Sequence, residues 1–118
     1  LSDLIARAGE DEVLQVADRD GDGVADAEVV AAALLHADTT IDGHVAARYA
    51  VPLTAVPPLV RTWAVAIARY WLHRDGAPAH VRKDFEDAIA ALRDAAKGLV
   101  VIPGADGAAP PATGGGQV

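Results

Sequence analysis

The segment from residue 41 to residue 73, IDGHVAARYAVPLTAVPPLVRTWAVAIARYWLH, constrains the fold more than any other part of the chain. A helical pattern ends near residue 49, and Pro52, Pro57 and Pro58 follow before a second, almost wholly apolar helical pattern. Proline has a fixed φ and no backbone N–H, so it interrupts a helix but suits its first turn. The segment therefore predicts a helix, an apolar elbow over residues 51–58, and a buried helix.

The elbow is expected to be a contact surface, because loops normally face water and this one is apolar. Either the rest of the domain or a neighbouring subunit should cover it. Two Arg-Tyr pairs, at residues 48–49 and 69–70, fit interface anchors, since Arg and Tyr are enriched at hot spots. Contacts within the domain are the alternative, favoured for the second pair and left open for the first. The candidate contact residues here are Arg48, Tyr49, Val51, Pro52, Leu53, Val56 and Pro57.

Helical spacing along the rest of the chain predicts an all-α fold. We expect a short helix to Ala8 capped by Ser2, a short helix to Ala17, and long helices over 27–47, 58–74 and 78–97. The hydrophobic fraction is 52%, mostly Ala and Val with few aromatic residues, which favours closely packed helices over sheets. The expected architecture is a compact helical bundle with two long central helices, short N-terminal helices and an extended C-terminal arm.

Two local features are expected in the long helix over residues 27–47. Its N-cap is predicted at Asp26, and Gly43 lowers helix stability by about 1 kcal/mol relative to Ala. A bend at Gly43, or the close approach of another helix, would explain that glycine.

The chain changes character after Gly98. Residues 1–98 are predicted to form the helical domain and residues 99–118 an extended arm, which ends in PGADGAAPPATGGGQV, a stretch of linker-like composition. The arm is expected to hold a partner by adding a strand to it or by crossing a neighbour. Its β-prone contact residues are Leu99, Val100, Val101 and Ile102.

The net charge of −7 is concentrated at one end of the chain. Residues 1–28 contain nine acids and two bases, and the remaining residues are balanced. Because nucleic-acid binding needs clustered Lys and Arg, we do not expect specific DNA binding. An acidic face could meet a basic partner, let DNA pass without sticking, or simply be solvated. No apolar run is long enough to span a bilayer, so no membrane partner is expected.

The loop from residue 18 to residue 26, DRDGDGVAD, matches the front half of an EF-hand. Asp18, Asp20, Asp22 and Asp26 occupy loop positions 1, 3, 5 and 9, with glycine at position 6. Position 12, which should supply a bidentate Glu, is Val29. The loop is therefore a candidate structural calcium site, and the alternative is a turn whose aspartates cap the next helix.

No other pattern predicts a cofactor or a catalytic site. The chain has no cysteine and one serine, Ser2. The histidines, His36, His44, His73 and His80, match no zinc motif and are expected at the surface or its boundary. Trp63 and Trp71 are expected in the core. We therefore expect the protein not to be an enzyme.

The order of these pieces resembles the small head–tail connector family of Mu-like phages and prophages. The resemblance rests on LSDLIARAGEDEVLQVADRDGDGVADAEVVAAALLHAD, IDGHVAARYAVPL–VPPLVR–IARYWL and VRKDFEDAIAALRDAAKG, and covers residues 1–98. It implies a structural connector, or adaptor, that forms a ring, expected to be a dodecamer, on the portal protein. Its further partners would be neighbouring copies, a stopper or tail-terminator protein, and DNA that passes without specific binding.

The resemblance also implies a place and leaves alternatives. The protein would lie in the virion neck, at the head–tail interface, and in the host cytoplasm during assembly. The alternative function is a calcium-binding, EF-hand-like helical module, which would fold as a monomer and bind the ion through the residue 18–26 loop.

Overall fold

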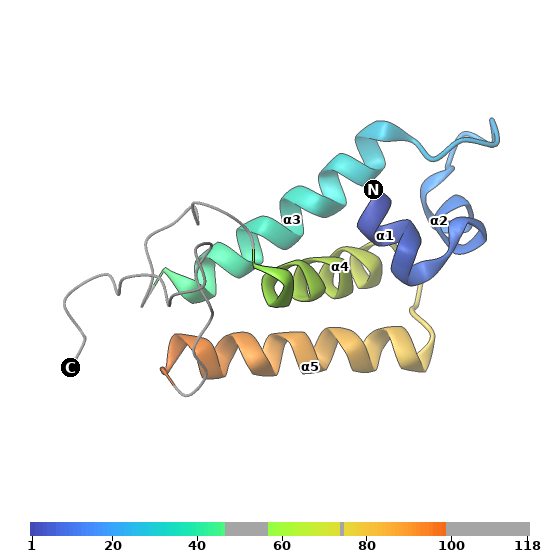
Figure 1. Cartoon of the computed structure of the whole chain (residues 1–118). Coiled ribbons are helices and arrows are strands. Elements are labelled where there is room, and N and C mark those ends of the chain that lie inside the picture. The colour runs from blue at the N-terminus through green and yellow to red at the C-terminus, as the bar shows by residue number, and fades with distance from the viewer. Residues whose placement is uncertain (47–56, 74, 99–118) are drawn as a thin grey trace.

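The computed structural model describes residues 1–46, 57–73 and 75–98 (Figure 1). These residues form α1 Ser2–Ala8, α2 Glu10–Ala17, α3 Ala27–Val45, α4 Pro58–Leu72 and α5 Ala79–Ala96. The described residues contain helices and no strand, which confirms the expected all-α bundle. The long helices end within two residues of the predicted limits, the margin expected for fraying helix termini.

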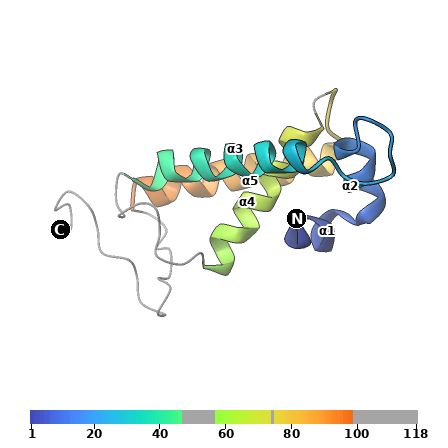
Figure 2. The same ribbon diagram turned by 90° about the horizontal axis from the view of Figure 1, so that it is seen from above.

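Helix α4 is the centre of the bundle. It contacts α1, α3 and α5, and the two longest helices, α3 and α5, also contact each other (Figures 1 and 2). Ile67 and Ala68 are completely buried, and Trp63 is 5% exposed. Because full burial of a large apolar side chain stabilises by about 1.5–3 kcal/mol, these side chains explain why an almost wholly apolar helix occupies the middle.

Pro58 is the first residue of α4, the position that proline favours. The N–H of the first residue of a helix has no intrahelical acceptor. The N–H that proline lacks therefore costs no hydrogen bond at this position. The prediction that a helix begins at the prolines is confirmed at this end. The expectation that α4 is buried on several sides is confirmed too.

Helices α1 and α2 form a short hairpin, and α1 packs against α4. Gly9 ends α1 with φ of 90°, a conformation that favours glycine, and α2 begins at the next residue. Leu4 and Val13 insert from the hairpin into the core. The hairpin therefore covers one side of α4 with few residues.

Two local expectations are wrong, the cap at Ser2 and the burial of Trp71. Leu1, not Ser2, precedes α1, and Ser2 makes no cap hydrogen bond. Asp26 is the N-cap residue of α3, as predicted, although its side chain makes no cap hydrogen bond. Trp71 is 37% exposed, because it lies on a side of α4 that no described helix covers fully. At Gly43 an added Cβ would meet nothing within 4 Å, so no other described helix approaches closely there, and the alternative, a bend, stays a prediction.

Most predicted contact elements lie outside the described residues. The elbow is described only at Pro57 and Pro58, and Arg48, Tyr49 and the arm from residue 99 onward are not described. The division into a domain of residues 1–98 and an arm therefore stays a prediction. All five helices of the described chain fall within residues 1–98.

Candidate functional site

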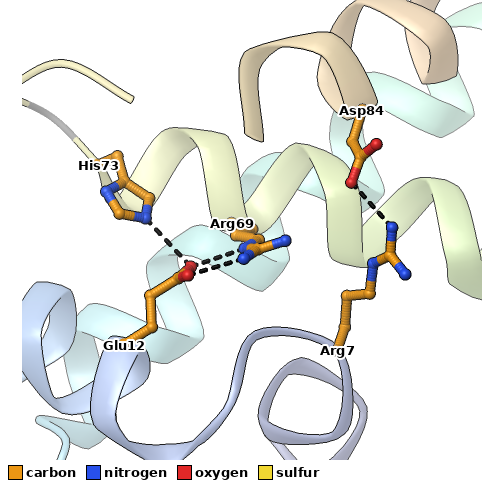
Figure 3. A network of polar contacts seen from close by, with 5 residues as sticks. All are labelled: Arg7, Glu12, Arg69, His73 and Asp84. Atoms are coloured by element: carbon orange, nitrogen blue, oxygen red, sulfur yellow. Dashed lines mark hydrogen bonds and ion pairs between the residues drawn. The ribbon is translucent and has the colours of Figure 1, made fainter. Parts of the chain in front are cut away.

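A polar cluster joins the N-terminal hairpin to the central helix (Figure 3). Arg69 of α4 donates two hydrogen bonds to Glu12 of α2, from Nε to Oε2 at 2.6 Å and from Nη2 to Oε1 at 2.7 Å. His73 Nε2 lies 3.1 Å from Glu12 Oε2 and is the donor of that contact, since a carboxylate only accepts. This two-point pairing fixes both the position and the orientation of the carboxylate.

This ion pair is largely buried, and its hydrogen bonds outweigh the cost of burial. The side chains of Arg69 and His73 are 8% and 10% exposed, and that of Glu12 is 20% exposed. The Arg69 guanidinium, with a smaller contribution from His73, lowers the pKa of Glu12 from 4.5 to about 2 although desolvation opposes the shift. The same hydrogen bonds to Glu12 raise the pKa of Arg69. Both groups are therefore charged across the range in which proteins normally work.

A second ion pair flanks the first and is much weaker. Arg7 of α1 donates to Asp84 of α5 at 3.0 Å, and the two side chains are 63% and 33% exposed. Solvent screens such pairs, so we assign it at most about 1 kcal/mol. Together the two pairs connect α1 and α2 to α4 and α5.

The aspartates of the residue 18–26 loop converge. One carboxylate oxygen from each of Asp18, Asp20, Asp22 and Asp26 lies within 4.8 Å of the others. Asp18 Oδ2 accepts from the backbone N–H of Gly23 at 2.8 Å, and Asp26 Oδ2 accepts from that of Arg19 at 3.0 Å. The aspartates thus hold the loop through its own amides rather than by capping α3, so the capping interpretation of the loop is wrong for the side chain of Asp26.

The clustering of carboxylates changes their acidity. The N–H of Asp22 favours the charged form of Asp20, but the neighbouring Asp18, Asp22 and Asp26 carboxylates outweigh it and raise the pKa of Asp20 to about 6. The pKa of Asp18 is lowered: desolvation opposes the shift, but the hydrogen bond from Gly23 and those from the neighbouring aspartates outweigh it. Accumulated negative charge of this kind is what a cation would relieve.

The back half of an EF-hand is missing from this loop. Val29, at loop position 12, packs against the hydrophobic core instead of facing the carboxylates. Glu28 beside it is exposed. The described residues therefore offer a calcium ion four carboxylates, each with one oxygen in the cluster. Because calcium takes six to eight oxygen ligands, the others would have to be the second carboxylate oxygens, carbonyls or water.

The other predicted site residues are scattered. His36 and His80 are exposed, and the side chain of His73 is largely buried against Glu12. His44 Nδ1 contacts the carbonyl oxygen of Thr40 at 2.8 Å, within its own helix. Among the described residues, the aspartate cluster is the only group of His, Cys, Asp or Glu that meets the distance requirement of a metal site.

Glu12 is the important residue that sequence reasoning missed. The interpretation of Arg69 as an intradomain residue is confirmed, but its partner is a carboxylate 57 positions away, not a ring or an elbow carbonyl. The sequence signal that could have indicated this ion pair was Arg69 itself. An arginine on an otherwise apolar helix requires a buried partner, and Glu12 beside the buried Val13 was a candidate.

Of the predicted contact residues, the described structure contains only Pro57. It precedes α4 and is buried, so its part in a contact between chains stays a prediction.

In the described ranges no helix is sufficiently long and apolar to cross a membrane. Exposed large apolar side chains do occur, above all Leu35, at 66%.

Comparison with known proteins places the chain among phage proteins. The family model described as "Bacteriophage Mu, Gp36" matches residues 1–118. The Mu-like prophage FluMu protein gp36 of Haemophilus influenzae is 37% identical over 70 residues, covering 59% of this chain and 50% of the relative. Gene product J of Escherichia phage Mu is 32% identical over 68 residues, covering 58% of this chain and 48% of the relative.

The matched region is thus about half the length of each of these relatives. The family model, by contrast, extends over the whole of the present sequence. On that basis the chain belongs to the Bacteriophage Mu Gp36 family.

Proposed function

We propose that this protein is a head–tail connector, or adaptor, that forms a ring on the portal of a tailed phage or prophage particle and lines the DNA exit channel. The observation that carries the proposal is the family match over residues 1–118, which agrees with the resemblance stated from the sequence. In this role the protein is structural rather than catalytic. Its place is the virion neck, and the host cytoplasm during assembly.

The polarity of the described bundle supports assembly into a ring. Helix α3 ends at Val45 and α5 is followed by Gly98 at one end of the molecule, while the residue 18–26 loop lies at the other (Figures 1 and 2). A closed ring needs two different faces that match each other. The predicted contact residues belong to the segments that follow Val45 and Gly98, and in this proposal those segments would supply one of the two faces.

The charge distribution supports a channel that DNA passes without being held. Seven net negative charges lie within residues 1–28, and the aspartates of the loop are exposed or half-exposed. Phosphate backbones bind tightly only where Lys and Arg replace their counterions, and this end of the chain repels them. The portal and a stopper or tail-terminator protein are the partners that this role requires.

The test is mass and stoichiometry, by light scattering and negative-stain imaging, with and without the cognate portal. We expect a ring on the portal that is lost when residues 99–118 are deleted. A shorter deletion of residues 104–118 is the matched control, because it keeps the β-prone run from Leu99 to Ile102. A monomer that ignores the portal would refute the connector role.

A calcium-binding module is the second candidate, favoured by the convergence of four carboxylate oxygens within 4.8 Å. It predicts a monomer whose melting temperature rises with calcium and falls with a chelator. Asp20→Asn should abolish that response, and Asp3→Asn, an exposed acid outside the loop, should leave it intact. A melting temperature indifferent to calcium would exclude the module.

A further inference from the structure

Two aromatic stacks border a pocket of about 490 Å³ near the turn between α4 and α5. Its walls include the rings of His36, Tyr70, Trp71 and Phe85. Tyr70 and Phe85 stack with ring centroids 4.1 Å apart and an interplanar angle of 9°. The His36 and Trp71 rings are stacked at 5.8 Å and 28°. Aromatic side chains therefore make up much of the pocket wall, and Arg19 adds one charged side chain to it.

Such surfaces are suited to proline. Proline-rich segments adopt an extended left-handed helix in advance of binding, and they dock in aromatic-lined grooves at little cost in conformational entropy. Each proline also offers a carbonyl acceptor. Tyr70 and Trp71 each carry a donor, a hydroxyl and an indole N–H, and within the described part of the chain neither group makes a hydrogen bond.

The chain itself carries a segment with this chemistry. Residues 108–113 read AAPPAT, with adjacent prolines at 110 and 111. Asp106 is the only charged side chain between residues 99 and 118. The AAPPAT segment is uncharged, so its burial against aromatic rings would desolvate no charge. We propose that this pocket binds residues 108–113 of the same molecule.

The arm is long enough to reach the pocket within one molecule. From Ala79 to Gly98 the chain rises about 29 Å along α5, and from Phe85 about 20 Å. The stretch from Leu99 to Pro110 spans about 37 Å when extended as a polyproline helix. The arm can therefore turn back along α5 and place Pro110 and Pro111 at the aromatic walls.

Tethering favours the arm of the same molecule over that of a second copy. A flexible tether of this length gives an effective concentration on the order of 1 mM, far above a micromolar concentration of free chains. A pocket with weak affinity would then still be occupied. This inference does not depend on the proposed connector role, since it concerns the isolated chain.

The absence of cysteine allows a direct test in the full-length protein. A spin label on Gly114→Cys lies three residues past Pro111, and it broadens the amide signals of nearby residues. In a ¹⁵N-labelled chain that carries its own label, we expect loss of intensity at His36, Tyr70, Trp71 and Phe85. The double substitution Pro110→Ala/Pro111→Ala in the labelled chain should restore these signals, whereas Pro103→Ala should not.

A mixed sample separates the arm of the same molecule from that of a neighbour. Here ¹⁵N-labelled chains without a spin label are combined with unlabelled chains that carry one, so only contacts between molecules broaden the signals. We expect no loss of intensity at the pocket in this sample. Broadening confined to the mixed sample, no broadening at all, or broadening that survives Pro110→Ala/Pro111→Ala would each overturn the proposal.

Discussion

Replacement of Glu12 by glutamine should destabilise the protein, because it breaks a largely buried ion pair from one side. The substitution preserves the shape of the side chain and one acceptor oxygen, but it leaves the Arg69 guanidinium, 8% exposed, without its countercharge. Breaking a buried pair on one side typically costs about 3–5 kcal/mol. Because the glutamine amide oxygen would retain one hydrogen bond and a fifth of the Glu12 side chain is open to solvent, we expect about 2 kcal/mol at pH 7.

The pKa of Glu12 gives a second route to the same magnitude. A fall from 4.5 to about 2 corresponds to about 3 kcal/mol of stabilisation by the charged form. Solvent screening of the partly exposed carboxylate reduces this to about 2 kcal/mol. Since the folded-state pKa is depressed, the stabilisation is complete above pH 4.5 and is lost as the pH falls through 2. By about pH 2.5 roughly a quarter of it remains.

The assay is urea denaturation followed by circular dichroism, with the wild-type chain and Glu12→Gln compared at about pH 7, 4.5 and 2.5. The difference in free energy of unfolding should shrink as the pH falls. Glu86→Gln, on an exposed residue of α5, is the matched control and should stay within about 0.5 kcal/mol. If Glu12→Gln matches that control at neutral pH, the ion pair does not hold the hairpin to α4. A difference that persists unchanged at the lowest pH would refute its electrostatic origin.

Three further changes test other parts of the structure. Ile67→Ala, at a fully buried position, should cost about 2–5 kcal/mol in urea denaturation, whereas Leu35→Ala, 66% exposed, should cost less than about 0.5 kcal/mol. Arg7→Ala should lower the free energy of unfolding by at most about 1 kcal/mol, because its ion pair is exposed. In NMR titration, Asp20 should titrate with a pKa of about 6, and Asp22→Asn should lower that value; a midpoint near the ordinary aspartate pKa of 3.8 in the wild-type chain would contradict the carboxylate clustering.

Local signals in the sequence predicted the helices well. Apolar spacing and the position of Pro58 located α3, α4 and α5 to within two residues, because both depend on neighbours along the chain. The predicted cap of α1 was wrong. Serine is a residue type that often caps helices, but Ser2 does not make the cap hydrogen bond here. Propensity describes what a residue can do, and the local geometry decides whether it does so.

The same local signals could not predict contacts between residues far apart in the sequence. The pairing of Glu12 with Arg69 joins residues 57 positions apart, and nothing in helical periodicity specifies which carboxylate meets a buried guanidinium. Trp71 was misplaced for a related reason. A helix that is apolar nearly all round shows no preferred face, so its exposed side is set only by where its neighbours pack.

The ion pair and the aromatic pocket are adjacent, because Arg69 of the pair directly precedes Tyr70 of the pocket in α4. His73 contacts Glu12 and also lines the pocket beside Tyr70 and Trp71, so the two features share a wall. Loss of the Glu12 carboxylate would release His73 and, with it, the wall of the pocket. Glu12→Gln should therefore break the ion pair and also weaken arm binding, whereas Pro110→Ala/Pro111→Ala should weaken arm binding and leave the ion pair intact. In this argument the pocket depends on the buried ion pair, and the ion pair does not depend on the arm. A comparison of the two variants would test that dependence.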